Sequence, residues 1–332
     1  MHAHWLTLLQ QPGIQLADDR VISTPAHAQP TTLVPLTNAC VISVSGPEAH
    51  KFLQGQLSCD LNTVNSTGSL PGAHCNIKGH IHSLYQVIHA GDACYWLRTQ
   101  TTMAADALAL LKKYIMFSKA EAALEDDLLG IGLLGSGASA LAERLTEAFP
   151  ETALVRHNET LIELWCAADQ LADLMAMAEA AAGIGCSNDW ELAAVDAGIP
   201  ELFPATREAF IPQMINLQVF EGVSFTKGCY TGQEIVTRLQ HRGQLKRPMY
   251  LAEVETEQAP EAGTRLASAS KENVGQIVRV AQCGDHRYRV LAVIVKDQAE
   301  QQSIHLESSA GPVLSMKALP YTLDPRLFES KR

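Results

Sequence analysis

A chain of 332 residues can form two or three hydrophobic cores, since domains commonly hold about 150 residues each. Hydrophobic residues make up 47% of it, its mean hydropathy is close to zero, and no apolar run of about 18 residues could cross a bilayer. A formal net charge of -11 excludes extensive, sequence-independent binding to nucleic acid, which requires many lysines and arginines. Residues 1–6 hold neither a basic leader nor a long apolar core, so we expect a cytoplasmic protein.

The eight cysteines are dispersed, without a C-x-x-C pair or a cluster with metal-ligand spacing. We therefore expect no resident zinc or iron–sulfur cluster, and no disulfide framework in a reducing compartment. His80 and His82 would share one face of a strand, but two histidines without a third ligand are a weak sign of metal binding. We expect these two histidines at the surface.

In chain order, residues 1–32 predict an appendage: a short helix and then a linker with Pro25 and Pro30. Apolar and β-branched runs then predict strands over residues 40–44, 84–89, 93–97, 128–134 and 161–165. Segments with helical spacing predict helices over residues 49–57, 102–114, 138–148 and 168–182, the last one ending at Gly183. The turn at residues 90–92 makes the second and third strands a hairpin.

After Gly243 the pattern changes to short alternating strands over residues 249–254, 274–280 and 288–295. This spacing predicts a small antiparallel barrel or sandwich. The mixed order of strands and helices in the whole chain predicts an α+β fold. The glycines at 130, 132, 135 and 137 do not have the G-x-G-x-x-G spacing of a dinucleotide site.

The segment Lys227–Glu234, with the sequence KGCYTGQE, contains a thiol, a flanking cation, two glycines and a helix start. Thr231 and Glu234 have the spacing of a capping box, which predicts a helix beginning here and continuing through Leu239. Cys229 would then lie just before a helix N-terminus and two residues from Lys227, and both features favour the thiolate. A nucleophilic or redox-active cysteine is one interpretation; a small buried side chain beside a tight turn is the other.

KGCYTGQE resembles the signature of the YgfZ family of folate-binding, tRNA-modifying proteins, which are related in fold to the aminomethyltransferase (T-protein) of the glycine cleavage system. Further segments agree in the expected order, and together they cover roughly residues 33 to 324: residues 46–49, 52–57, 75–79, 112–119, 196–200, 210–217 and 319–321. The resemblance implies two interleaved ferredoxin-like units around a central folate pocket, followed by a C-terminal barrel. We place these regions at residues 33–125, 126–242 and 243–326.

The resemblance also implies a function: binding of tetrahydrofolate and support of iron–sulfur enzymes, including those that thiomethylate tRNA. The family's invariable cysteine falls on Cys229, which we expect to be the reactive centre, with Lys227 keeping it partly ionised. Gly228 and Gly232 would let the backbone approach the ligand. The expected folate-binding residues are Trp190, Asp196, Gly228, Tyr230, Gly232, Gln233, Glu234, Arg238 and Arg242.

Trp190 follows Asn188, a good N-cap, and its indole face could stack on the folate or anchor the helix in a core. A second tryptophan, which relatives carry just before the first strand, has no counterpart here, because residues 37–40 contain no aromatic side chain. Asp196 replaces a glutamate that pairs with the pterin in T-proteins, and His82-Ser83 replaces their catalytic aspartate, which weakens an aminomethyl-transfer reading. A group of basic residues is either a solvated face or a site for the glutamate tail of folate: Lys227, Arg238, His241, Arg242, Lys246 and Arg247.

We therefore expect a tetrahydrofolate-binding accessory factor for iron–sulfur enzymes that affects tRNA indirectly. The reaction at Cys229 stays open: attack on a one-carbon folate adduct, transfer of sulfur, or a transient mixed disulfide. Two alternatives are a folate-dependent one-carbon transferase or demethylase and a non-catalytic folate sensor.

Overall fold

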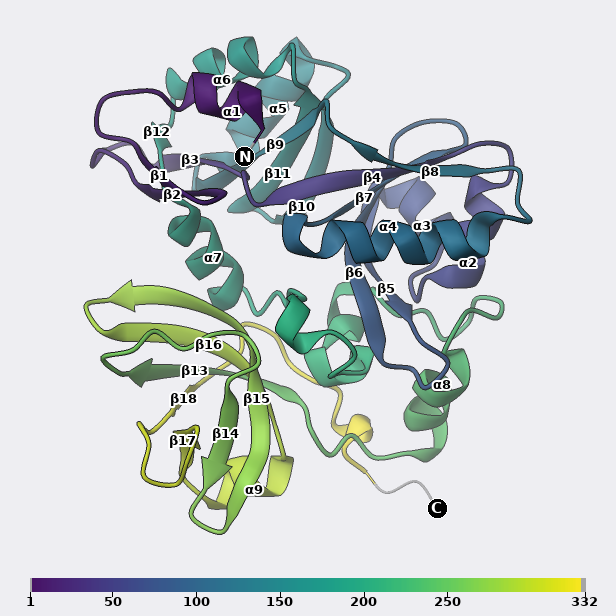
Figure 1. The fold of residues 1–332 in the computed structure, drawn as a ribbon, viewed down its shortest axis with the longest axis vertical. Helices are drawn as coiled ribbons and strands as arrows, with labels where there is room; N and C mark the ends of the chain where they lie inside the picture. The colour runs from purple at the N-terminus through teal and green to yellow at the C-terminus, as the bar shows by residue number, and fades with distance from the viewer. Residues whose placement is uncertain (1, 330–332) are drawn as a thin grey trace. The chain divides into compact units, whose positions relative to one another are not determined.

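The computed structural model describes residues 2–329, except for the side chains of Thr67 and Arg242. The chain divides into two compact units. Figure 1 shows the helices and strands along the chain. Unit 1 comprises the chain up to Phe52, Val64–Ser69 and Gln86–Ala193. Unit 2 comprises Leu53–Thr63, Leu70–Tyr85 and the chain from Ala194 onward. None of the helices within residues 2–329 combines the length and apolar character needed to cross a bilayer.

The first sheet of unit 1 has five strands in the order β10-β11-β9-β3-β12. Their bounds are Ala153–Asn158, Leu161–Ala167, Leu128–Gly135, Thr31–Pro35 and Gly183–Ile184. All neighbours are antiparallel except β12, which runs parallel to β3. Helices α5 (Ala138–Ala148) and α6 (Leu171–Glu179) supply leucines to the core on this sheet. The predicted strands at 128–134 and 161–165 and the helix at 138–148 are confirmed.

The segment predicted as an appendage, residues 1–32, contributes side chains to this core. They contain α1 (Ala3–Leu8), β1 (Gln15–Ala17) and β2 (Arg20–Ser23). Trp5, Leu9 and Val21 are each only 1% exposed and lie in the cluster with the strands of the sheet. Burial of a tryptophan, a leucine and a valine stabilises this arrangement by removing a large apolar area from water.

The second sheet of unit 1 places β4 (Ala39–Ser45) between β7 (Cys94–Gln100) and β8 (Glu121–Glu125). On the other side of β7, Gln86–His89 of strand β6 (Ile81–His89) pair with it in antiparallel register, which confirms the predicted hairpin. Helix α4 (Thr101–Ile115) packs on β4, β7 and β8. It matches the helix predicted over residues 102–114.

Unit 2 contains a six-stranded antiparallel sheet in the order β17-β14-β15-β16-β13-β18. The strands are Ile304–Leu306, Arg265–Ser268, Lys271–Gly284, Arg287–Ile294, Met249–Glu255 and Ser315–Lys317. Figure 1 shows that the sheet curls, and its aliphatic side chains form a separate core. Short antiparallel strands after Gly243 are therefore confirmed.

The rest of unit 2 combines short elements. These are the later parts of α2 (Ala49–Gln56) and α7 (Ser187–Asp196), the start of α3 (Leu61–Thr67), most of β5 (Ser69–Cys75), the start of β6, helices α8 (Gln233–Arg242) and α9 (Lys296–Gln301), and 3-10 turns at Pro204–Thr206, Pro212–Ile215, Leu217–Phe220 and Pro325–Leu327. Asn216 lies between two of these turns with φ 56°, and its amide donates to the carbonyl of Met249 at 3.1 Å and to the hydroxyl of Tyr321 at 3.3 Å.

Two predicted helix ends are wrong. Helix α6 covers Leu171–Glu179, not residues 168–182, and Gly183 lies in β12, where it pairs with Thr32. A side chain at Gly183 would collide with the ring of His27, so a close approach rather than a helix stop explains this glycine. Helix α7 begins at Ser187, so Asn188 is not its N-cap; the carboxylate of Asp189 accepts from the N–H of Cys186 at 2.7 Å.

Candidate functional site around Cys229

The segment KGCYTGQE lies in unit 2 directly before α8 (Figure 1). The predicted capping box is wrong, because the N-cap is Gly232 and no side chain caps the helix. Gly232 has φ 83°, and a Cβ there would lie 2.5 Å from the carbonyl oxygen of Asn76 and 2.9 Å from the Cβ of Cys75. Only glycine satisfies both conditions. The hydroxyl of Thr231 instead donates to the amide oxygen of Gln56 at 3.4 Å.

Lys227 fixes this loop to a distant part of unit 2. Its ammonium donates to the carbonyl of Leu57 at 2.9 Å and to that of Cys59 at 2.6 Å, and lies 5.2 Å from the ring centroid of Tyr230. Burial disfavours the charged form more than nearby Cys59 and Asp60 favour it, so the pKa of Lys227 falls to about 8. The observed role of Lys227 is to anchor the loop; its effect on the ionisation of Cys229 stays a prediction.

Cys229 is exposed, whereas the other seven cysteines are buried or half-buried within the described residues. Burial raises the pKa of Cys59 and of Cys75 to about 12, and that of Cys166 likewise. These thiols are therefore protonated as well as hidden at neutral pH. Within residues 2–329, Cys229 is therefore the cysteine most accessible to a reagent, a cofactor or a partner protein.

The neighbours of Cys229 differ in their surroundings. A Cβ at Gly228 would meet no atom within 4 Å, so the backbone there faces open space. Tyr230 is buried, which raises its pKa, and its hydroxyl has no hydrogen-bond partner within residues 2–329. Gln233 donates from its amide to the carbonyl of Gly228 at 3.5 Å.

The first turns of α8 bring three further predicted residues together. Gln233, Glu234 and Arg238 line an open hollow of about 660 Å³ with Thr237 and His241. Arg238 and Glu234 are exposed, so both charges are available to a ligand. The side chain of Arg242, also predicted here, lies outside the described residues.

Trp190 belongs to unit 1, where its indole is only 4% exposed. The ring lies against Gly132, where a Cβ would lie 2.5 Å from its Cζ3 atom, and it meets the edge of His157 at a centroid distance of 6.0 Å. This is the environment of a core tryptophan. Stacking on folate stays a prediction.

Asp196 belongs to unit 2 and already has a partner. Its Oδ1 atom accepts from Arg289 at 2.6 Å, and the same guanidinium contacts Glu253 at 3.3 Å. One of the two carboxylate oxygens of Asp196, which we expected to pair with a pterin, is therefore already bound to Arg289 of the C-terminal sheet.

Unit 1 contains a buried charge cluster that we did not predict from the sequence. Glu163 is fully buried in β11; its carboxylate accepts from Trp165 at 2.8 Å and contacts Arg98 at 3.1 Å and His157 at 2.9 Å. Burial alone would raise the pKa of Glu163, but the charge of Arg98 and the hydrogen bonds hold it at about 2. A lone glutamate within the apolar run 161–165 is the only trace of this cluster in the sequence.

Three histidines in or beside β5 and the start of β6 lie in unit 2, namely His74, His80 and His82. His82 contacts the hydroxyl of Ser83 at 2.9 Å, and His80 is half-buried. His74 is fully buried, and burial, aided by nearby His82, lowers its pKa to about 4. Within residues 2–329, no three His, Cys, Asp or Glu side chains are grouped so that they could hold a metal ion.

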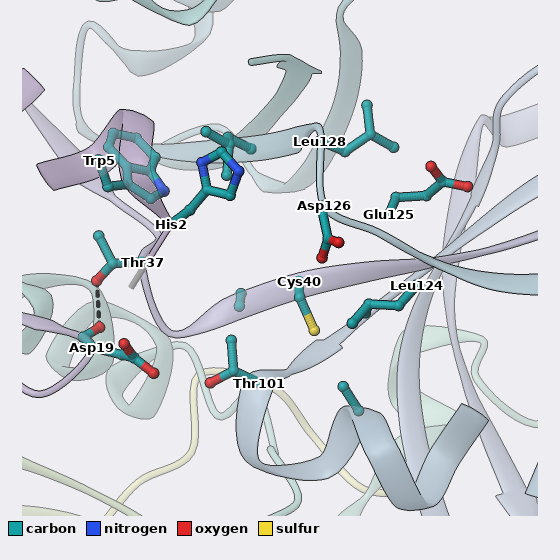
Figure 2. A pocket seen from close by; sticks show the side chains of 13 residues that line it. His2, Trp5, Asp19, Thr37, Cys40, Thr101, Leu124, Glu125, Asp126 and Leu128 are labelled. Atoms are coloured by element: carbon teal, nitrogen blue, oxygen red, sulfur yellow. Dashed lines mark hydrogen bonds between the residues drawn. The ribbon is translucent and has the colours of Figure 1, made fainter. Parts of the chain in front are cut away.

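Unit 1 also contains a cavity of about 240 Å³, shown in Figure 2. Trp5 and several leucines form apolar walls, and Asp19, Glu125 and Asp126 bring carboxylates from separate segments. Glu125 accepts a hydrogen bond from Ser43. Burial raises the pKa of Cys40 in the wall to about 11.

No family model matches the chain. The tRNA-modifying protein YgfZ of Colwellia psychrerythraea is 32% identical over 311 residues, which cover 90% of this chain and 95% of the relative. The chain belongs to the YgfZ family. The YgfZ of Sodalis glossinidius is 31% identical over 317 residues, with the same coverage of both chains.

A solved structure shows how this YgfZ-family chain is related in fold. The glycine cleavage system aminomethyltransferase T from Bartonella henselae matches with a TM-score of 0.69 and 15% identity. The match covers 92% of this chain and 88% of that one. The expected fold relationship to T-proteins is therefore confirmed, and at this identity it concerns the fold alone.

Proposed function

We propose that this YgfZ-family chain is a tetrahydrofolate-binding accessory factor that supports iron–sulfur enzymes, and thereby tRNA thiomethylation, through the thiol of Cys229. The observation that carries the proposal is the exposure of Cys229 on a loop held by two hydrogen bonds from Lys227. The relatives' name, tRNA-modifying protein, supports the tRNA role. The partners would be cytoplasmic iron–sulfur enzymes, and the net charge of -11 favours an indirect effect on tRNA.

A fixed, accessible thiol suits each of the reactions that the sequence leaves open. Attack on a one-carbon adduct, transfer of sulfur and formation of a mixed disulfide all use the Sγ atom of Cys229 as the nucleophile. Lys227 holds the backbone on one side of Cys229, and the turn at Gly232 holds it on the other. The sulfur is thereby presented without a large ordering cost when a substrate arrives.

The fit of folate rests on the loop rather than on Trp190 and Asp196, which have partners within their own units. The open backbone at Gly228 gives room for a ring, and the buried hydroxyl of Tyr230 lacks a partner in the described chain. Arg238 would attract the carboxylates of the glutamate tail. Bound tetrahydrofolate would supply an acceptor or donor of one-carbon groups. The proposal includes the family architecture of interleaved ferredoxin-like units and a closed C-terminal barrel.

The test is complementation of cells that lack this protein. Wild type, Cys229→Ala and the control Cys283→Ala would be expressed at matched levels, and the thiomethylated fraction of tRNA measured. We expect wild type and the control to restore modification and Cys229→Ala to leave less than about a tenth of it. Equal restoration by Cys229→Ala would reduce the cysteine to a structural role and favour a folate sensor. Failure of wild type would contradict the accessory role itself.

Folate binding has its own test, by calorimetry with tetrahydrofolate. Gly228→Ala adds a methyl group in open space, so it should preserve the free energy of unfolding while weakening folate binding several-fold. Arg238→Ala should weaken binding of a polyglutamylated folate more than that of the monoglutamate. Unchanged affinity in both variants would remove this loop from the folate site.

A further inference from the structure

The turn that follows α4 in unit 1 exposes large apolar side chains that the folate and thiol chemistry do not use. Figure 1 shows the position of α4 in the fold. Phe117 is 94% exposed, Met116 is 73% exposed, and Tyr114 is 43% exposed. Single exposed apolar residues are ordinary, but three within four positions form a patch of the kind that marks interaction sites. The patch is defined here as Lys112–Lys119.

The fold holds this patch in one conformation. Ile115 is buried beneath it, and the N–H of Ser118 donates to the carbonyl of Ile115 at 2.8 Å. Glu48 binds the following residue twice: its carboxylate accepts from the N–H of Lys119 at 2.7 Å, and its own N–H donates to the carbonyl of Lys119 at 3.1 Å. A Cβ at Gly46 would lie 2.7 Å from that carbonyl oxygen, so glycine permits the contact. Little backbone entropy is therefore lost at this end of the patch when a partner binds.

The charge of the patch opposes that of the whole chain. Residues 112–119 contain three lysines and no acid, in a chain of net charge -11. Lys112, Lys113 and Lys119 are exposed, and none of them forms an ion pair within residues 2–329. The carboxylate of Glu48 is engaged by the N–H of Lys119 and lies 3.6 Å from Lys51, and the charge of Lys119 also acts on it. These exposed positive charges favour a partner with negative charge at the edge of its binding surface.

We propose that the patch is a docking surface for a partner protein with an apolar groove bordered by acidic side chains. Phe117 and Met116 would insert into the groove as anchors, and the three lysines would face its rim. Stacking of RNA bases is the weaker reading, because Lys113 lies over the ring of Tyr114 at 5.4 Å and leaves Phe117 as the one fully exposed ring of the patch. The inference deepens the proposed function, on which it rests, by naming the surface that an iron–sulfur client would contact.

The experiment measures binding of a purified, fluorescently labelled iron–sulfur tRNA-thiomethylating enzyme by anisotropy. Phe117→Ala should weaken binding at least about 10-fold, as expected for a buried anchor. The double variant Lys112→Glu, Lys113→Glu should weaken it similarly, and raising salt from roughly 50 to 300 mM should weaken wild-type binding. Val313→Ala, which truncates a 54% exposed side chain of unit 2, is the matched control and should bind as wild type does.

Three results would overturn the inference. They are absence of binding by wild type, equal binding by Phe117→Ala, and Phe117-dependent binding of unmodified tRNA or of a second copy of this chain in place of the enzyme. If the enzyme does not bind but Cys229→Ala still fails to restore modification in cells, the docking surface is wrong and the proposed function stands. If Phe117-dependent binding of the enzyme is observed but Cys229→Ala restores modification as well as wild type does, the docking surface stands and the thiol-dependent role is wrong.

Discussion

Two buried charges, one in each unit, are held in different ways. Glu163 in unit 1 has a cation, an imidazole and an indole N–H around its carboxylate, and its pKa stays at about 2. Lys227 in unit 2 has two neutral carbonyls at its ammonium, and its pKa falls to about 8. An opposite charge offsets the cost of burial, whereas peptide dipoles offset only part of it. Glu163 therefore stays ionised at neutral and mildly acidic pH, and Lys227 titrates near physiological pH.

Removal of the carboxylate of Glu163 should have the largest effect on stability. Glu163→Ala leaves Arg98 buried without its partner, so the free energy of unfolding should fall by about 3–5 kcal/mol. Urea unfolding followed by tryptophan fluorescence measures it, since Trp165 contacts the cluster. Glu159→Ala, at an exposed pair with Arg156, is the control and should change stability by less than about 0.5 kcal/mol. Equal losses in both variants would mean that burial does not determine how much an ion pair contributes to the free energy of unfolding.

Acid should affect the two units in different pH ranges. His74 in unit 2 has its pKa lowered from 6.5 to about 4, so the unfolded chain binds more protons and stability falls as pH drops from 6.5 to 4. Glu163 in unit 1 keeps its contribution above 4.5 and loses it as pH falls towards 2. The slope from one group cannot exceed about 1.4 kcal/mol per pH unit.

Stability measured by urea titration from pH 7 to 4 tests this order. His74→Phe should flatten the profile between pH 6.5 and 4, and Glu163→Gln should leave its slope above about pH 5 unchanged. A flat wild-type profile in this range would contradict the contribution assigned to His74.

Lys227→Met should cost less than Glu163→Ala, about 1–3 kcal/mol, because it leaves two carbonyls without a donor but removes a charge that burial already disfavours. The loop should loosen, and alkylation of Cys229 by iodoacetamide should slow if Lys227 favours the thiolate. Lys271→Met, at an exposed position of unit 2, is the control. An unchanged alkylation rate together with lower stability would leave Lys227 only its anchoring role.

The exposed pair of Asp196 and Arg289 should show the smallest effect. Their side chains are 44% and 25% exposed, so Asp196→Ala should lower the free energy of unfolding by about 0.2–1 kcal/mol despite the 2.6 Å contact. Calorimetry with tetrahydrofolate on the same variant tests whether Asp196 contributes to folate binding. A large loss of affinity with little loss of stability would return Asp196 to the folate site.

Local pattern was sufficient for many elements of this fold. The alternation at 84–89 and 93–97 predicted a hairpin that the structure contains, and the alanine- and leucine-rich run at 102–114 predicted α4. The helix starts at Thr231 and Asn188 were wrong because capping depends on which backbone N–H groups the surroundings leave free. Trp5 and Val21 looked like parts of an appendage, since no local pattern shows which distant core a side chain joins.

Of the candidate site, the sequence alone determined the composition of the loop and the chain's resemblance to a family, because an eight-residue signature is read along the backbone. Tertiary structure decided the contacts of those residues. Lys227 reaches carbonyls 170 and 168 positions away, and Asp196 meets Arg289 93 positions later. Glu163 required Arg98, which lies on another strand of the unit. Such contacts depend on how the chain folds back on itself, and residue order does not record that geometry.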